Sequence, residues 1–160
     1  MKIFDKLLGK KRPEIVLLTP PGPIGELQLL LTNQALELAK EFRKHLDFTN
    51  RSIQTVEAIL GEVHDHYRKS KDDTGLNGIA FQLGAYIATT IQRNFNEGTL
   101  NRDDPTIGQG TFPFSFRDGT IFPFAWCQKR IFDGSADNVY SKYKVLVLDT
   151  SSTSKNGRAQ

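Results

Sequence analysis

The longest stretch of the chain without a charged side chain runs from Thr74 to Gln92. A helix that is apolar over more than half of its circumference is buried in a protein core or in a membrane. Because amide and hydroxyl side chains such as Gln82, Thr89 and Thr90 interrupt the stretch, we expect a buried central helix of a soluble domain. The apolar positions that recur at helical spacing are Leu76, Ile79, Ala80, Leu83, Gly84, Ile87, Ala88, Ile91 and Phe95.

Two amphipathic helices are predicted before this central one. In residues 24–46, apolar side chains repeat at steps of three and four, and residues 53–68 show the same period. Leu29 and Leu36 form a second, narrower stripe on another side of the first helix. Either two elements of the chain pack on this helix, or its N-terminal half contacts a partner. The main predicted stripe of the first helix consists of Ile24, Leu27, Leu31, Ala35, Leu38, Phe42 and Leu46.

Alternating aromatic residues surround the dipeptide Asp118-Gly119, which is a strong signal for a β-hairpin. With this turn, Phe116 would face Ile121 and Phe114 would face Pro123. Proline removes a ladder donor, so the sheet should be small or its strands should lie at edges. Both faces of the hairpin would be apolar, one with Phe112, Phe114 and Phe116 and the other with Phe122, Phe124 and Trp126.

Residues 138–148 fit either a helix or a buried strand, and we predict a helix. The chain is therefore expected to be an α+β protein. It would have three long helices, the third central and buried, then a Phe-rich antiparallel hairpin or small sheet and a C-terminal helix. We expect a single domain over residues 24–149. A basic amphipathic arm and a Pro-rich linker (residues 1–23) precede it, and a polar tail (150–160), predicted to be disordered, follows.

The formal net charge of +3 is concentrated at the ends of the chain. Residues 1–12 contain five basic and one acidic side chain, and residues 151–160 contain two basic ones. Residues 13–150 therefore carry a net charge of −3. Because phosphate binding needs clustered basic charge on the folded surface, this distribution does not favour nucleic acid as a partner.

The N-terminal residues 1–8 form an amphipathic pattern, with Met1, Ile3, Phe4, Leu7 and Leu8 on one side. Such a segment can bind an anionic membrane surface. A solvated terminus is the simpler interpretation, because isolated helices this short are marginal in water. The apolar run lacks the length of a secretory signal, and one cysteine suits a reducing compartment. We expect a cytoplasmic protein, with membrane association through Met1–Arg12 as the alternative.

Three separated segments form a recognisable layout. They are Leu46-Asp47-Phe48-Thr49-x-x-Ser52-Ile53-x-x-Val56-Glu57-x-x-Leu60, then Leu83-Gly84-Ala85-Tyr86-Ile87 with Arg93-Asn94-Phe95, and Phe122-Pro123-Phe124 with Lys129-Arg130-Ile131-Phe132-Asp133-Gly134 and Asp137-Asn138-Val139. This layout resembles a family of small bacterial α+β domains of unknown function. The resemblance covers about residues 45–148 and implies a bacterial, cytoplasmic protein of unassigned activity, with no catalytic residues to transfer.

No group of residues forms a recognisable catalytic or metal-binding motif. His64 and His66 are two positions apart and point to nearly opposite sides of a helix, so only Glu62 and His66 share a side, and two ligands do not make a site. Cys127 has no local signature of a nucleophile, and we expect it in the core. We therefore predict no cofactor, no metal site and no enzymatic activity.

The sequence favours a protein-interaction domain, one version of which is an immunity-type protein that binds a basic toxin. We expect the basic residues after the aromatic run to bind carboxylates or a helix C-terminus. The alternatives are a membrane-peripheral module anchored by residues 1–12 and an enzyme with an unrecognised site that uses Cys127, Arg130 or the His64 region. The predicted interaction surface consists of Leu29, Leu36, Phe122, Phe124, Trp126, Lys129 and Arg130.

Overall fold

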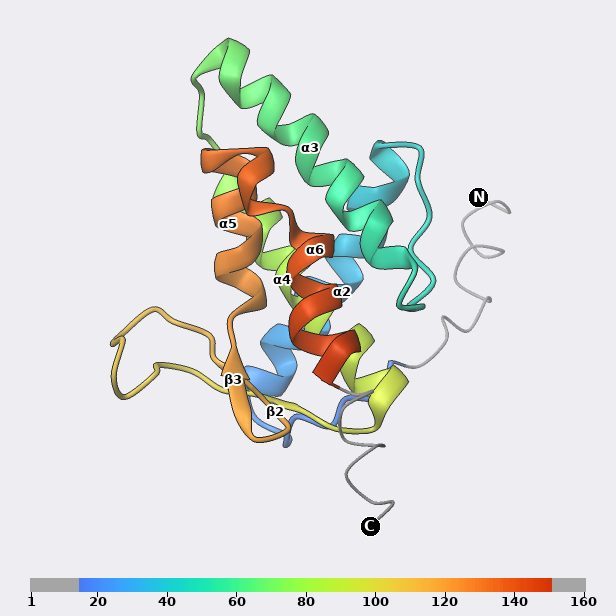
Figure 1. Cartoon of the computed structure of the whole chain (residues 1–160), viewed down its shortest axis with the longest axis vertical. Helices are drawn as coiled ribbons and strands as arrows, with labels where there is room; N and C mark the ends of the chain where they lie inside the picture. The colour runs from blue at the N-terminus through green and yellow to red at the C-terminus, as the bar shows by residue number, and fades with distance from the viewer. Residues whose placement is uncertain (1–14, 151–160) are drawn as a thin grey trace, which may run out of the picture.

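The computed structural model describes residues 15–150, so the predicted basic arm and disordered tail lie outside the described residues. The α+β prediction is confirmed, because long helices precede and follow a small antiparallel sheet (Figure 1). The elements are α2 (Pro23–Glu41), α3 (Ser52–Ser70), α4 (Leu76–Phe95), β1 (Thr99–Leu100), β2 (Phe114–Phe116), β3 (Gly119–Ile121), α5 (Pro123–Asp133), the 3-10 turn η1 (Ser135–Asp137), α6 (Val139–Tyr143) and the π-helical turn η2 (Lys144–Leu148).

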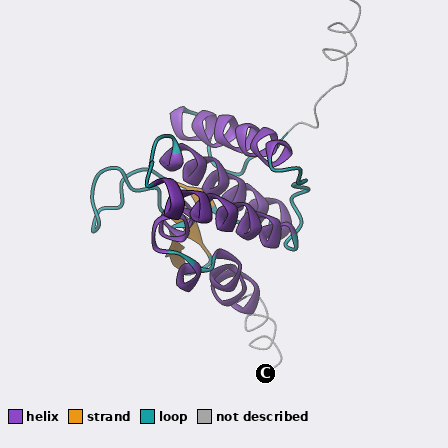
Figure 2. Ribbon diagram, turned by 90° about the horizontal axis from the view of Figure 1, so that it is seen from above, coloured by secondary structure: helices purple, strands orange, loops and turns teal. Residues whose placement is uncertain are grey.

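Helix α4 is the central element, as its charge-free sequence predicts. All residues from Leu83 to Gln92 are buried, including the polar ones. Helix α2 packs along one side of α4 and α5 along another, while α3 packs mainly on α5 and α6. Figure 2 shows the helices stacked in successive rows, with one long loop projecting from the bundle.

Gly84 allows the backbones of α4 and α5 to touch. A Cβ atom on residue 84 would lie 2.7 Å from Cα of Phe124 and 2.9 Å from its backbone nitrogen. Real Cβ atoms do not approach backbone atoms this closely, so only glycine fits between the two helices without a shift. The absence of a side chain at residue 84 therefore permits the close packing of α4 against α5.

The hairpin exists, but its register and its second arm differ from the prediction. Phe116 pairs with Gly119 and Phe114 with Ile121, so the turn residues are Arg117 and Asp118. Arg117 takes the left-handed conformation, with φ of 54°, and its backbone N–H donates to Oε1 of Glu97 at 2.9 Å. This register buries Phe114, Phe116 and Ile121 on one face and leaves Ser115 and Thr120 exposed on the other.

The predicted second strand ends early because helix α5 begins at Pro123. Proline at the first helical position loses no hydrogen bond, whereas in a strand it removes a ladder donor. Phe124 and Trp126 therefore lie on a helix, where both are buried in the core. The prediction of a hairpin with two apolar faces is wrong.

Helix α2 buries a different side from the predicted one. Its buried positions carry small or polar side chains, while large residues such as Ile24, Leu31 and Leu38 are half-buried beside them. The helix ends at Glu41 rather than Leu46, because Arg43 has a φ of 56° and the chain turns there. The buried positions are Gly25, Gln28, Thr32, Ala35 and Ala39.

A buried hydrogen-bond network fastens α2 to α4. Gln28 donates from Nε2 to Oγ1 of Thr89 at 3.0 Å and to Oε1 of Gln92 at 2.9 Å. Gln92 donates to Oγ1 of Thr19 at 2.9 Å and to the carbonyl of Gly98 at 3.1 Å. The hydroxyl of Thr19 donates to Oε1 of Gln28 at 2.6 Å. Each amide of the two glutamines therefore has its partners inside the core, which makes the burial of these polar groups tolerable.

Thr19 belongs to the predicted Pro-rich linker, yet it lies in the core. It is 6% exposed, and its hydroxyl also accepts from the backbone N–H of Leu100 at 3.2 Å. A Cβ on Gly25 would lie 2.8 Å from the carbonyl oxygen of Pro20, so this segment packs tightly on α2. The folded body therefore begins before residue 24, in contrast to the predicted boundary.

Gln92→Leu is expected to lower the free energy of unfolding by about 1–3 kcal/mol, because the carbonyl of Gly98 and one N–H of Gln28 lose their partner. Urea denaturation measures the change. Gln82→Leu is the matched control. The amide of Gln82 lies on the same helix but donates to Oε1 of Gln34 at the surface. The effect of Gln82→Leu should remain within about 0.5 kcal/mol. Equal stability of the two variants would show that the network is energetically unimportant.

The segment 138–148 is helical, as predicted. Asn138 accepts from the N–H of Ser141 at 2.8 Å and caps α6, which continues into η2. Val139, Tyr143 and Val147 are buried, whereas Leu146 is exposed. At the start of α3, the hydroxyl of Thr49 accepts from the backbone N–H of Ser52 at 3.1 Å.

Candidate interaction surface

The structure separates the seven residues of the predicted interaction surface. Phe124, Trp126 and Arg130 are buried, Phe122 is half-buried and Lys129 is exposed. Three of the five residues after the hairpin therefore contribute to the core, and the predicted surface there is wrong. Leu29 and Leu36 lie on α2, where Leu29 is 38% exposed and Leu36 is half-buried.

Arg130 binds a carboxylate, as expected for one of the two basic residues after the aromatic run. Its Nε donates to Oε1 of Glu57 at 2.6 Å, and Oε2 of Glu57 accepts from the backbone N–H of Val139 at 2.8 Å. Only 9% of the Arg130 side chain and 14% of the Glu57 side chain are exposed. This ion pair joins α3, α5 and the start of α6, so its role is structural.

Cys127 is fully buried next to this ion pair. Burial raises the pKa of its thiol well above the usual value, and the nearby carboxylate of Glu57 raises it further. A thiol with a raised pKa does not form the thiolate that nucleophilic catalysis requires. The expectation that Cys127 is a core residue is confirmed.

The histidines are not gathered into a site. Nδ1 of His64 is 2.7 Å from the carbonyl oxygen of Ile131, which ties α3 to the end of α5. His45 lies in the loop after α2, and His66 is exposed on α3. Within residues 15–150, no group of three or more His, Cys, Asp or Glu side chains is arranged to hold a metal ion.

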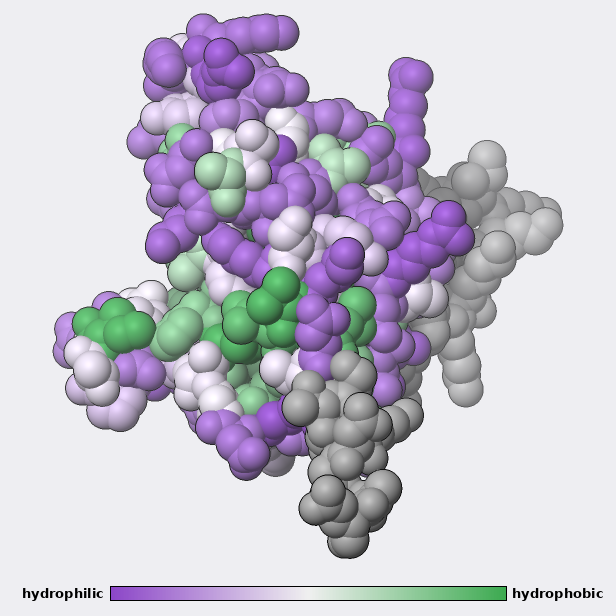
Figure 3. Space-filling model, viewed as in Figure 1, coloured by the Kyte–Doolittle hydropathy of each residue, from purple (hydrophilic) through white to green (hydrophobic). Residues whose placement is uncertain are grey.

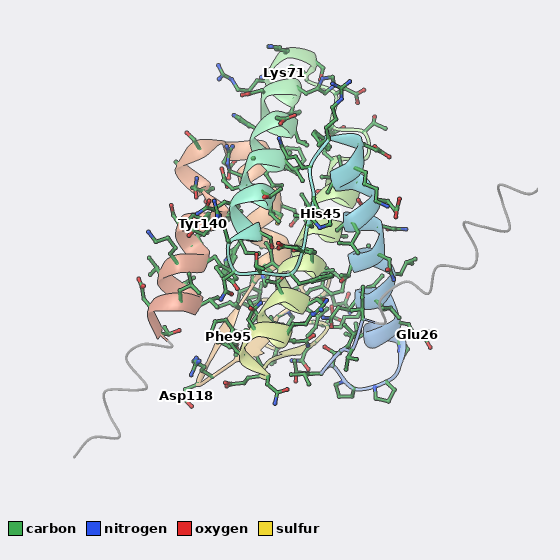
Figure 4. All side chains as sticks on the ribbon, turned by 90° about the vertical axis from the view of Figure 1, so that its right-hand side faces the viewer. Glu26, His45, Lys71, Phe95, Asp118 and Tyr140 are labelled. Carbon is green, nitrogen blue, oxygen red and sulfur yellow. The ribbon has the colours of Figure 1, made fainter. Side chains whose placement is uncertain are left out.

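More than half of the large hydrophobic residues that are exposed in the described part of the chain belong to α2 and the segment that leads into it. Of the seven large hydrophobic residues that are exposed in the described part of the chain, four belong to residues 16–30. They are Val16, Leu18, Leu29 and Leu30, of which Leu30 is 55% exposed. Figure 4 shows α2 along one outer edge of the bundle, with Glu26 pointing outward near its first turn. We call these four residues and the adjoining groove the α2 surface.

The groove of the α2 surface lies between α2 and the N-terminal half of α4. Its volume is about 580 Å³, and its apolar lining is formed by Leu30, Leu38 and Ile79. The two charged residues that line it, Glu37 and Glu41, are both acidic. The remaining lining residues carry amide side chains: Asn33, Gln34 and Gln82.

A smaller cavity of about 190 Å³ adjoins this groove on the other side of α2. Asn33 and Glu37 line both cavities. Leu36, which the sequence assigned to the interaction surface, lines the smaller cavity together with Ile15, the first described residue. The remaining lining residues are Lys40, His45, Leu46 and Phe48.

The other three large apolar residues that are exposed in the described part belong to other elements. Ile107 lies on the long projecting loop, and Val145 and Leu146 lie on η2. Figure 3 shows a mostly hydrophilic face with a hydrophobic area across its middle and another on the projecting loop at its left. A further cavity of about 740 Å³ lies between the hairpin turn and η2, but Glu97, Arg117 and Asp118 mix both signs of charge in its lining. The α2 surface therefore has the strongest features of an interface.

Residues of the segments that carry the family resemblance contact one another. The N–H of Phe48 donates to the hydroxyl of Tyr86 at 2.7 Å, and Nδ2 of Asn94 donates to the carbonyl of Phe48 at 2.7 Å. The guanidinium of Arg93 lies 4.2 Å from the ring centre of Phe48. These residues fix the α2–α3 loop on α4, so their role in this chain is structural.

No family model, curated protein or solved structure matches this chain. The resemblance therefore stays a prediction. In the part of the chain that the structure describes, no helix is long and apolar enough to cross a membrane.

Proposed function

We propose that this protein is a non-enzymatic protein-interaction domain that binds its partner through the α2 surface. The observation that supports this most is the exposure of leucines on α2, a helix whose buried side is small and polar. Hydrogen bonds from Gln28 and Thr32 hold α2 in place, so its large apolar residues are not all needed for packing. Contiguous exposed apolar side chains with a polar rim are typical of protein interfaces.

The charges of the α2 surface favour a partner with a basic amphipathic segment. Glu37 and Glu41 line the groove, and Glu26 lies on the same helix. Lys40 is the one basic residue of α2, and its Nζ is 2.9 Å from Oε1 of Glu37. An exposed ion pair of this kind contributes little stability, so a cation of the partner can replace Lys40 beside Glu37. Because the α2 surface presents acidic and apolar groups side by side, it would bind a helix that has one basic and one apolar face.

One concrete form of this proposal is an immunity-type protein that neutralises a basic toxin in a bacterial cytoplasm. The net charge of −3 over residues 13–150 supports it, because opposite charge accelerates association. The membrane-peripheral alternative depends on residues 1–12, which lie outside the described residues. The enzyme alternative has less support, because Cys127 is fully buried and Arg130 is buried in an ion pair with Glu57.

Site-specific photo-cross-linking in the native host tests the proposal. A photoreactive benzophenone side chain replaces Leu30 on the α2 surface or, as a matched control, Val145 on η2, which is similarly exposed. We expect one protein with a basic segment to be cross-linked from position 30 and not from position 145. Cross-linking from position 145 alone, or equal products from both positions, would contradict the assignment of the α2 surface.

A further inference from the structure

Strand β3 forms one edge of the sheet and lines a cavity. The strand order is β1-β2-β3, so within the described sheet β3 pairs with β2 alone. Phe116 and Gly119 flank the two-residue turn and face each other as a hydrogen-bonded pair, so the next residue, Thr120, directs its backbone N–H and C=O away from β2. Backbone groups at a sheet edge can pair with another chain. All three residues of β3 line the cavity of about 740 Å³ between the hairpin turn and η2.

Arg117 occupies the first position of the hairpin turn in a conformation that favours glycine. Its φ is 54°, whereas Asp118 at the second position does not have a positive φ. A two-residue turn with a positive φ at its first position alone usually has glycine there, because a side chain is strained in that conformation. The carboxylate of Glu97 supports the strained backbone by accepting the N–H of Arg117 at 2.9 Å. Since strained residues are concentrated at functional sites, this arginine indicates a role beyond the turn itself.

The side chain of Arg117 lines the same cavity and has no charged partner among the described residues. Its guanidinium lies 5.0 Å from the ring centre of Phe116 and 5.9 Å from that of Phe95. Nε is buried without a hydrogen-bond partner in the described part of the chain, and none of the ion pairs found there involves Arg117. A buried donor without a partner is costly, and the planar fork of a guanidinium matches a carboxylate. A bound carboxylate would therefore supply the partner that the fold does not.

We propose that the edge of β3 binds the extended C-terminal segment of a partner protein, with the terminal carboxylate on Arg117. A strand added antiparallel to β3 has its C-terminal end beside the start of β3, next to Arg117. Alternate side chains of that strand would face Ile121 and Leu146, which line the cavity. Glu97 and Asp118 also line it, so the segment should carry neutral or basic side chains before its terminus. This site is separate from the α2 surface and does not depend on it.

Titration of the full-length protein with synthetic peptides, followed by nuclear magnetic resonance, tests the proposal. The probes are two pools of acetylated hexapeptides made of Val, Thr, Leu and Lys in random order, one with free C-terminal carboxylates and one with C-terminal amides. We expect the acid pool to shift the backbone amide signal of Thr120 and the Nε–H signal of Arg117, and to leave the methyl signals of Leu30 on the α2 surface unchanged. The amide pool should bind about tenfold more weakly or less, because it lacks the charged acceptor.

Arg117→Gly removes the guanidinium and suits the positive φ of the turn, so the hairpin should keep its fold. In this variant the acid and amide pools should bind equally weakly, whereas Arg102→Gly on the projecting loop, the matched control, should bind like the wild-type protein. Equal binding of the two pools to wild-type protein, or no shift of the Thr120 signal with the acid pool, would overturn the proposal. A Thr120 signal that shifts with protein concentration alone would assign the edge to a second copy of the chain and would also contradict it.

Discussion

Arg130→Ala is expected to lower the free energy of unfolding by about 3–5 kcal/mol. The substitution leaves the carboxylate of Glu57 largely buried with the N–H of Val139 as its remaining donor. It also removes the side chain that joins α5 to α3. An unpaired buried charge costs far more than a lost surface ion pair, because desolvation of the carboxylate is no longer offset. Chemical denaturation monitored by circular dichroism measures the loss.

Two further variants make the Arg130 result specific. Lys129→Ala changes the neighbouring, exposed cation on the same helix and should shift stability by no more than about 0.5 kcal/mol. The double variant Glu57→Gln/Arg130→Met removes both charges and should recover part of the stability that Arg130→Ala loses. If Arg130→Ala is as stable as Lys129→Ala, the ion pair does not hold the three helices together.

Gly84→Ala and Gly78→Ala are expected to change stability in opposite directions, although both lie in α4. A methyl group at residue 84 would overlap the backbone of Phe124, and forcing it in should cost about 1–3 kcal/mol or more. At residue 78, a Cβ would meet nothing within 4 Å. Alanine there should stabilise the helix by about 0.5–1 kcal/mol, because glycine is the weaker helix former.

Thermal unfolding of the two alanine variants measures this difference. The melting temperature should fall for Gly84→Ala and rise slightly for Gly78→Ala. A loss at both positions would mean that alanine is unfavourable throughout α4 for some other reason. No loss at residue 84 would mean that α5 can move away from α4, contrary to the close contact between the two helices.

Helices α3 and α4 could be predicted from the sequence because their apolar residues have a clear period. Helix α2 also has that period, but the side that it buries could not be predicted. The leucine positions predict that the stripe through Leu31 and Leu38 is the buried side, whereas Gln28 and Thr32 are buried in the structure. Their partner Thr89 is 57 or more positions away in the chain, so no local pattern indicates that these polar groups will be satisfied.

The aromatic pattern that predicts the hairpin continues beyond the end of its second strand. Asp118-Gly119 correctly indicates a reversal, but the alternating aromatics after it include Pro123, which begins helix α5. Proline is favoured at the first position of a helix, so Pro123 also indicates that the strand ends before it and that Phe124 and Trp126 lie on a helix. Leu29, which the sequence places on a second stripe of α2, belongs to the α2 surface, whereas Leu36 lines the smaller cavity. The positions of Leu30 and of the acidic groove residues depend on how α2 sits against α4.

The affinity of the cross-linked partner for matched variants tests the role of the α2 surface most directly. Calorimetric titration of the purified partner into wild-type protein, Leu30→Asp and Val145→Asp compares two similarly exposed positions. We predict that Leu30→Asp weakens binding by about tenfold or more, which corresponds to about 1.4 kcal/mol, while Val145→Asp binds like the wild-type protein. Undiminished binding by Leu30→Asp would contradict the assignment of the α2 surface as the binding face.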